Sequence, residues 1–231
     1  MSIKCRLNTV ELIMFLVDLF VAGGFVMYPL LGFSILAIAL IIERCLFWRK
    51  VNRQQRRVVR DVLADYQMGA DTVMPKLRQH SDLPIARIFM EAMEVDYAPP
   101  QAFHNFLEGA IQAELPILRR FNTIFDTIVT AAPLLGLLGT VTGLIRSFAN
   151  LDLGSVGQEG TARVTGGISE ALISTATGLV VAVLVLLFAN AFRGFYRRQI
   201  ALIQEYTNQL EALHFCRYQE GRSGQVMVSK E

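Results

Sequence analysis

Charged residues are scarce in this chain. Asp, Glu, Lys and Arg make up 18% of its 231 residues, whereas 53% of the residues are hydrophobic. A soluble globular domain usually carries about 25% charged residues. This shortage argues against a wholly soluble protein and directs attention to where the apolar residues lie.

Cysteine, histidine and tryptophan are also rare, with three, three and one copies. Cys5, Cys45 and Cys216 have no metal-ligand spacing and are odd in number. The sequence has no glycine-rich phosphate loop and no nucleophile motif. We therefore expect no cofactor, no metal and no catalytic residue, and the sequence does not predict an enzyme.

Three long stretches of the sequence contain no charged residue. They cover residues 19–42, 127–145 and 171–192, and each is long enough for a transmembrane helix. We predict an all-α membrane protein whose three transmembrane helices have long cytoplasmic helical extensions, with a short amphipathic helix at the N-terminus. The predicted parts are an outer N-terminal segment (1–22), a first span (23–48), a cytoplasmic helical domain (49–126), a second span (127–147), a short outer loop (148–166), a third span (167–192), and a cytoplasmic C-terminal helix and tail (193–231).

Basic residues predict the orientation of the spans. Seven of them lie from Arg44 to Arg60, three more follow the third run closely, and only two lie between the second and third runs. Segments on the cytoplasmic side of a membrane are enriched in Lys and Arg. We therefore place the amino terminus outside and the carboxyl terminus in the cytoplasm. A basic cluster beside a span is expected from topology alone, so we predict no nucleic-acid partner.

Helical spacing continues beyond the apolar runs. Pro29 suits the first turn of the first span, and residues 51–66 extend that helix without a breaker. From Gln101 the pattern predicts one long helix that enters the membrane and is kinked at Pro116 and Pro133. The third span is also predicted to continue well past its apolar run.

The second span has a stripe of small residues. On a helical wheel one side holds five small or hydroxyl-bearing residues, namely Ala132, Gly136, Thr140, Gly143 and Ser147. Gly139 and Gly143 also have the GxxxG spacing that lets two membrane helices approach closely. The stripe indicates a helix-packing face through Gly136, Gly139 and Gly143, with or without a further role.

The third span opens with polar residues. Glu170, Ser174 and Thr177 share one stripe, and Thr175 lies about 140° around the helix from Glu170. An ionised acid at mid-membrane costs roughly 2.5–3.5 kcal/mol and usually faces a bundle interior or a wet cavity. Two interpretations of Glu170 stay open: a proton site, or an interfacial acid favoured by the helix dipole. The hydroxyls either hold water or bond to their own backbone.

Two stretches together resemble the signature of the MotA/TolQ/ExbB proton-channel family. They are "AAPLLGLLGTVTGLIRSF" and "GISEALISTATGLVVAV", and "GGFVMYPLLGFSILAIALIIER" in the first span is similar to ExbB-type members. The likeness extends from about Gly23 to Leu210. It implies a protein of the bacterial inner membrane with three spans that forms a homo-oligomer, a pentamer in the well-described members.

The resemblance also implies partners and site residues. The ring would surround a dimer of an ExbD-type or TolR-type protein, whose single membrane helix carries an aspartate. Proton flow past that aspartate would drive motion that energises a TonB-like or TolA-like protein. Glu170, Thr140 and Thr175 match the family's polar residues that line the inner surface. The helical wheel adds Ser174 and Thr177 to this predicted proton pathway.

The first-span motif favours an ExbB-type subunit that energises TonB-dependent import across the outer membrane. A TolQ-type subunit that energises TolA for envelope integrity is an alternative. So is a non-conducting membrane scaffold, for which a carboxylate at Glu170 would be dispensable. A flagellar stator subunit fits less well, because those proteins usually have four spans.

Overall fold

The computed structural model describes residues 11, 14, 17, 18, 20–69, 72–95, 97–149 and 158–228, with side chains described only up to 149 and from 165 to 220. All regular structure in these residues is α-helical. Within these residues, three helices are long and apolar enough to cross a membrane. The chain is therefore an all-α, multi-pass membrane protein, as its uncharged runs predicted. Most of the N-terminal segment predicted at 1–22 lies outside the described residues.

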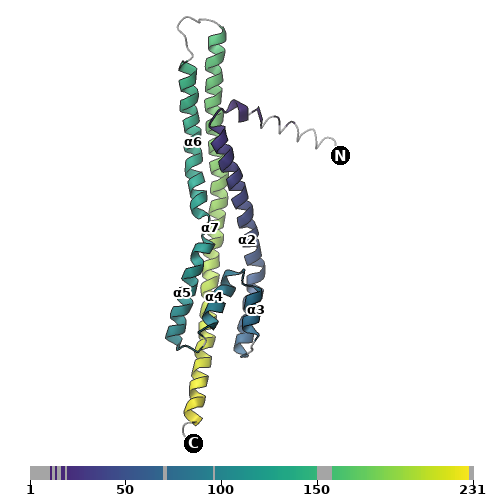
Figure 1. Ribbon diagram of the computed structural model, residues 1–231, viewed down its shortest axis with the longest axis vertical. Coiled ribbons are helices and arrows are strands. Elements are labelled where there is room, and N and C mark those ends of the chain that lie inside the picture. The colour runs from purple at the N-terminus through teal and green to yellow at the C-terminus, as the bar shows by residue number, and fades with distance from the viewer. Residues whose placement is uncertain are drawn as a thin grey trace, which may run out of the picture. The chain divides into compact units, whose positions relative to one another are not determined.

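Three long helices carry the apolar runs (Figure 1). They are α2 (Met27–Gln67), α6 (Asn122–Ala149) and α7 (Gln158–Val228). Gly24, with φ of 71°, lies in the turn that precedes α2, and Pro29 falls in the first turn of that helix. Helix α7 already includes residues 158–166, which the sequence had assigned to the outer loop; this segment contains no proline to end a helix.

The chain divides into two compact units. Unit 1 contains residues 1–42 and 121–190, and unit 2 contains residues 43–120 and 191–231, so that α2 and α7 each contribute to both. In unit 1, α6 and the first part of α7 run side by side (Figure 1). Val26, Met27 and Leu30 pack with Ala132 and Ala182 in the core of this unit. Its outer surfaces expose many large apolar side chains, which suits contact with lipid.

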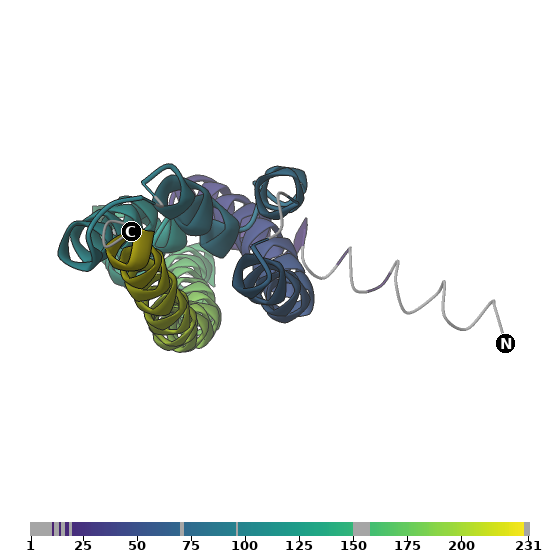
Figure 2. The same cartoon turned by 90° about the horizontal axis from the view of Figure 1, so that it is seen from below.

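Unit 2 adds three shorter helices to the ends of α2 and α7. They are α3 (Val73–Gln79), α4 (Pro84–Met93) and α5 (Pro100–Leu118), and Figure 2 views these helices nearly end-on, with the yellow C-terminal part of α7 towards the viewer. Ile85, Ile88 and Phe89 of α4 are fully buried. His214 stacks on Phe103 with ring centroids 3.8 Å apart.

The prediction of one long helix from Gln101 into the membrane was wrong. Helix α5 ends at Leu118, and α6 begins at Asn122. Phe121 between them has a φ of 70°, a left-handed conformation that ends a right-handed helix. Pro116 does not kink a continuous helix; it lies one turn before this break. Pro133 lies inside α6, which continues past it.

Candidate functional site

Glycines form the contact between α6 and α7 in unit 1. Gly136, Gly139 and Gly143 of α6 are all buried. A Cβ atom at Gly136 would lie 3.0 Å from the Ser174 carbonyl oxygen, and one at Gly143 would lie 2.9 Å from the Gly167 carbonyl oxygen. The two backbones therefore approach more closely than larger residues would allow.

Two hydroxyls of α7 lie at this contact and share one acceptor. Thr175 Oγ1 donates to the Gly136 carbonyl oxygen at 3.0 Å. Ser174 is 0% exposed, and its Oγ donates to Ala171 of its own helix at 2.9 Å while lying 3.4 Å from the same Gly136 oxygen. Both residues thus face the backbone of α6, although the helical wheel had separated Thr175 from the stripe of Ser174.

The hydroxyls of Thr140 and Thr177 bond within their own helices. Thr140 Oγ1 donates to Leu137 at 2.7 Å, and Thr177 Oγ1 donates to Ile173 at 2.8 Å. Both side chains are half-buried. Since each hydroxyl proton is already donated, the oxygens keep only lone pairs to offer to another group.

Glu170 lies at a junction of three segments. Its Oε1 accepts a hydrogen bond from Arg146 at 3.1 Å, with side chains 21% and 58% exposed respectively. Its carboxylate packs against Gly24, where a Cβ atom would overlap it. Glu170 of α7 is therefore held between the last turn of α6 and the turn before α2. Sequence reasoning missed Arg146, although a basic residue at the end of the neighbouring span was a usable signal.

The arrangement joins a partly buried carboxylate to a short row of hydroxyls. Ser174 and Thr175 lie about one turn after Glu170, which is about 6 Å along α7. A carboxylate in such a place can carry a charge beside a second helix, and hydroxyl oxygens can accept hydrogen bonds from water or from a protonated acid. The described residues contain no cluster of side chains suited to a metal ion.

This site lies inside a stretch shared with known proteins. The model of the MotA/TolQ/ExbB proton channel family matches residues 80–205, which is more than half of the chain. The chain belongs to this family. The match covers α6 and α7 as far as Glu205 and so includes Glu170 and all the polar residues described above. The prediction of the family from the two membrane motifs is confirmed.

Individual relatives extend the similarity to most of the chain. The ExbB-like 3 biopolymer transport protein of Synechocystis sp. is 56% identical over 193 residues, which cover 84% of this chain and 92% of that protein. The biopolymer transport protein ExbB of Neisseria meningitidis is 31% identical over 73% of this chain and 80% of its own length. The Tol-Pal system protein TolQ of Pseudomonas aeruginosa is 33% identical, over 46% of this chain and 42% of its own length.

Family membership fixes the class of activity. MotA/TolQ/ExbB proteins are channel and transport subunits, so this family member is a membrane subunit of the proton-channel type and not an enzyme. This confirms the prediction made from the absence of catalytic motifs. Similarity to ExbB-type proteins covers more of the chain than similarity to TolQ.

Proposed function

We propose that this protein is an ExbB-type subunit of an inner-membrane motor driven by the proton motive force. It assembles as a homo-oligomer, a pentamer as in the members it resembles, around an ExbD-type protein whose single membrane helix carries an aspartate. The motor energises a TonB-like protein for import across the outer membrane. The amino terminus lies in the periplasm and the carboxyl terminus in the cytoplasm, in keeping with the basic residues after the first and third runs.

The observation that best supports this proposal is the position of Glu170. The carboxylate is only partly exposed, lies beside Arg146, and begins the row of hydroxyls on the α6–α7 contact. An acid in such surroundings usually serves an ion or proton pathway. Moving one charge across 100 mV supplies about 2.3 kcal/mol, which a motor can convert into motion.

The hydroxyls suggest how this part of the protein distinguishes a protonated from an ionised carboxyl of the partner. Thr140, Ser174, Thr175 and Thr177 donate their protons to backbone carbonyls. The oxygens of Thr140, Thr175 and Thr177 are half-buried and can then accept hydrogen bonds, so they suit a protonated aspartic acid better than an ionised aspartate. Ser174 is 0% exposed and stays inside the α6–α7 contact. In the proposed motor the partner's carboxyl passes these hydroxyls in its neutral form.

A TolQ-type role remains the second candidate, because a TolQ protein is 33% identical over 106 residues. The TolQ-type role differs from the ExbB-type role in the protein that the motor energises. Deleting the whole protein from the native cell distinguishes the two roles. Loss of energised nutrient uptake indicates TonB coupling, whereas loss of envelope integrity indicates TolA coupling. A non-conducting scaffold would show neither loss when only the carboxylate of Glu170 is removed.

The deciding experiment is Glu170→Gln in the native cell, with uptake of a ferric siderophore as the measurement. Glu205→Gln, an exposed position further along α7, is the matched control. We expect uptake to collapse in the first variant and persist in the second, while both proteins reach wild-type abundance and co-purify with a one-span partner. Normal uptake in Glu170→Gln, together with intact assembly, would contradict the proposal.

A further inference from the structure

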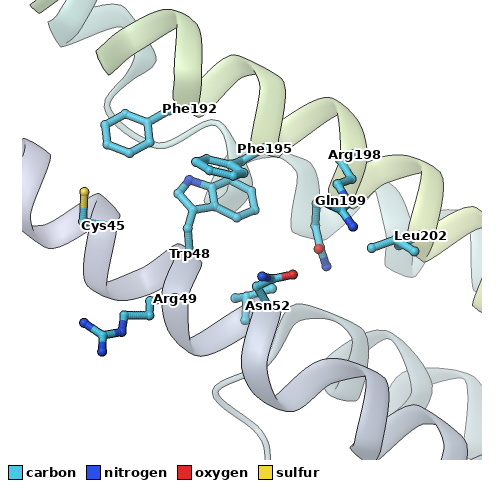
Figure 3. Close-up of a pocket in the computed structure, with 10 residues that line it drawn as sticks. Cys45, Trp48, Arg49, Asn52, Phe192, Phe195, Arg198, Gln199 and Leu202 are labelled. Carbon is cyan, nitrogen blue, oxygen red and sulfur yellow. The ribbon is translucent and has the colours of Figure 1, made fainter. Parts of the chain in front are cut away.

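A pocket of about 260 Å³ opens between α2 and α7 in unit 2 (Figure 3). Its lining comes from five residues of α2 between Cys45 and Asn52 and five residues of α7 between Phe192 and Leu202. Both stretches come where an uncharged run ends, the first run at Ile42 and the third at Phe192. The pocket therefore lies where the two helices leave the hydrocarbon core.

The lining changes in character along α7. Phe192 and Phe195 stand at the end of the apolar run, and Trp48 lies 6.0 Å from Phe195 between ring centroids (Figure 3). Arg198 follows Phe192 by six residues, which is about 9 Å along the helix. This exceeds the interfacial layer on one side of a bilayer, which is about 5–8 Å thick. An apolar end thus faces the membrane, and a polar end faces away from it.

The two arginines of the pocket have no carboxylate partner among the described residues. Arg49 and Arg198 both line it and are exposed. Neighbouring basic residues differ, because Arg44 pairs with Glu43 and Lys50 pairs with Asp82. Both guanidinium groups are therefore available to an anion, and a guanidinium matches the geometry of a phosphate.

We propose that this pocket binds the glycerol-phosphate end of an anionic phospholipid from the surrounding bilayer. The phosphate lies near Arg198 at the polar end of the pocket, and Arg49, whose side chain points away from α7 (Figure 3), adds positive charge at the same level of the membrane. The first methylenes of the acyl chains lie against Phe195, which is 48% exposed. The volume is too small for a whole lipid, so the chains remain in the bilayer beside the protein. Placement in the cytoplasmic leaflet rests on the orientation proposed above, whereas the lipid selectivity does not.

Trp48 provides a direct measurement, because it is the only tryptophan in the chain and is 7% exposed. The full chain is placed in phosphatidylcholine bilayers that contain a minor fraction of brominated phosphatidylglycerol or of brominated phosphatidylcholine. Bromine quenches tryptophan fluorescence at short range. A basic residue near a membrane favours an anionic lipid about fivefold. We expect brominated phosphatidylglycerol to quench at least that much more effectively at equal fraction.

Two matched double variants distinguish an effect of the pocket from an effect of the other basic residues near the membrane surface. R49Q/R198Q removes both arginines of the pocket, whereas R53Q/R197Q removes the same charge from the same helices at positions that do not line it. We expect the preference for phosphatidylglycerol to vanish in the first and persist in the second. R49K/R198K should keep part of it, and unchanged thermal unfolding shows that each variant is folded.

Three outcomes overturn the proposal. If both glutamine variants lose the preference for phosphatidylglycerol equally, the preference comes from all the basic residues near the membrane surface and not from the pocket. Equal quenching by both brominated lipids in the wild-type protein would show that the pocket does not select an anion. No quenching by either lipid would show that another protein surface, such as a second copy of the chain, covers the pocket. None of these results depends on uptake or on Glu170, so failure here is distinct from failure of the proposed function.

Discussion

The helices of the two units pack against one another through different kinds of residue. In unit 1 the helices meet through glycines, and Ser174 and Thr175 are hydrogen-bonded to backbone carbonyls at that contact. In unit 2 they meet through large side chains such as Tyr66, Phe89 and Phe103. Lipid chains are as apolar as leucine, so burying leucine brings no gain within a membrane. Close backbone contact and hydrogen bonds then decide how the helices pair.

The buried and partly buried polar side chains also differ between the two units. In unit 2, His214 is enclosed by hydrogen bonds to Tyr66 at 3.2 Å and to the Ala98 carbonyl at 3.0 Å. Arg87 forms two bonds of 2.6 Å to the Glu114 carboxylate. These groups fix the arrangement of a conventional core. In unit 1 the Arg146–Glu170 pair joins the last turn of α6 to α7 and is partly exposed.

The largest effect should come from truncating an aromatic residue in unit 2. Phe103→Ala removes the ring that stacks on His214 and should lower the free energy of unfolding by about 3–5 kcal/mol. Leu187→Ala in unit 1 should change it by less than about 0.5 kcal/mol, because Leu187 is 62% exposed. Thermal unfolding of both variants in bilayers measures the contrast. A comparable loss in Leu187→Ala would show that a protein surface covers that face.

A single methyl group should have the next largest effect, and its sign should depend on position within α7. The Cβ of Gly178→Ala would lie 2.6 Å from the Ala132 carbonyl oxygen, so the helices must separate. We expect a loss of about 1–3 kcal/mol. Gly166→Ala has open space around it and should stabilise α7 by up to about 1 kcal/mol. The unfolding temperature should therefore fall in Gly178→Ala and rise in Gly166→Ala. A shift in the same direction in both variants would contradict the close contact of the two helices at Gly178.

The sequence predicted most of this comparison. The uncharged runs predicted the three membrane helices. The small-residue stripe contained Gly136 and Gly143, and Gly139 came from the GxxxG spacing; all three glycines are buried. The break at Phe121 was missed, because no sequence signal marks a left-handed phenylalanine. A helical wheel also misjudged Thr175. It assumes one facing direction, whereas the glycine contact brings the Gly136 carbonyl between two successive residues.

The interhelical hydroxyl bond should have a smaller effect on stability. Thr175→Val keeps the shape of the side chain but removes the bond to the Gly136 carbonyl, at a cost of about 0.6 kcal/mol. Thr130→Val is the control, because its hydroxyl bonds only to its own helix and is exposed. If Thr175 belongs to the proton pathway, siderophore uptake falls far more than stability does. Uptake that falls only in proportion to stability would give Thr175 a packing role alone.

The smallest effect tests whether exposed ion pairs contribute to unit 2 at all. A hydrogen bond from Lys50, 2.7 Å away, lowers the pKa of Asp82 below its ordinary value. A carboxyl whose pKa is lowered by folding stabilises the protein above its unfolded pKa of about 3.9, and this contribution is lost as pH falls through the folded value. Both side chains are largely exposed, so Lys50→Met should cost only a few tenths of a kcal/mol at neutral pH. Thermal unfolding of the variant and the wild type should differ slightly at neutral pH and converge in strong acid. A difference that persists in acid would come from the stem of Lys50 packing on unit 2 and not from its charge.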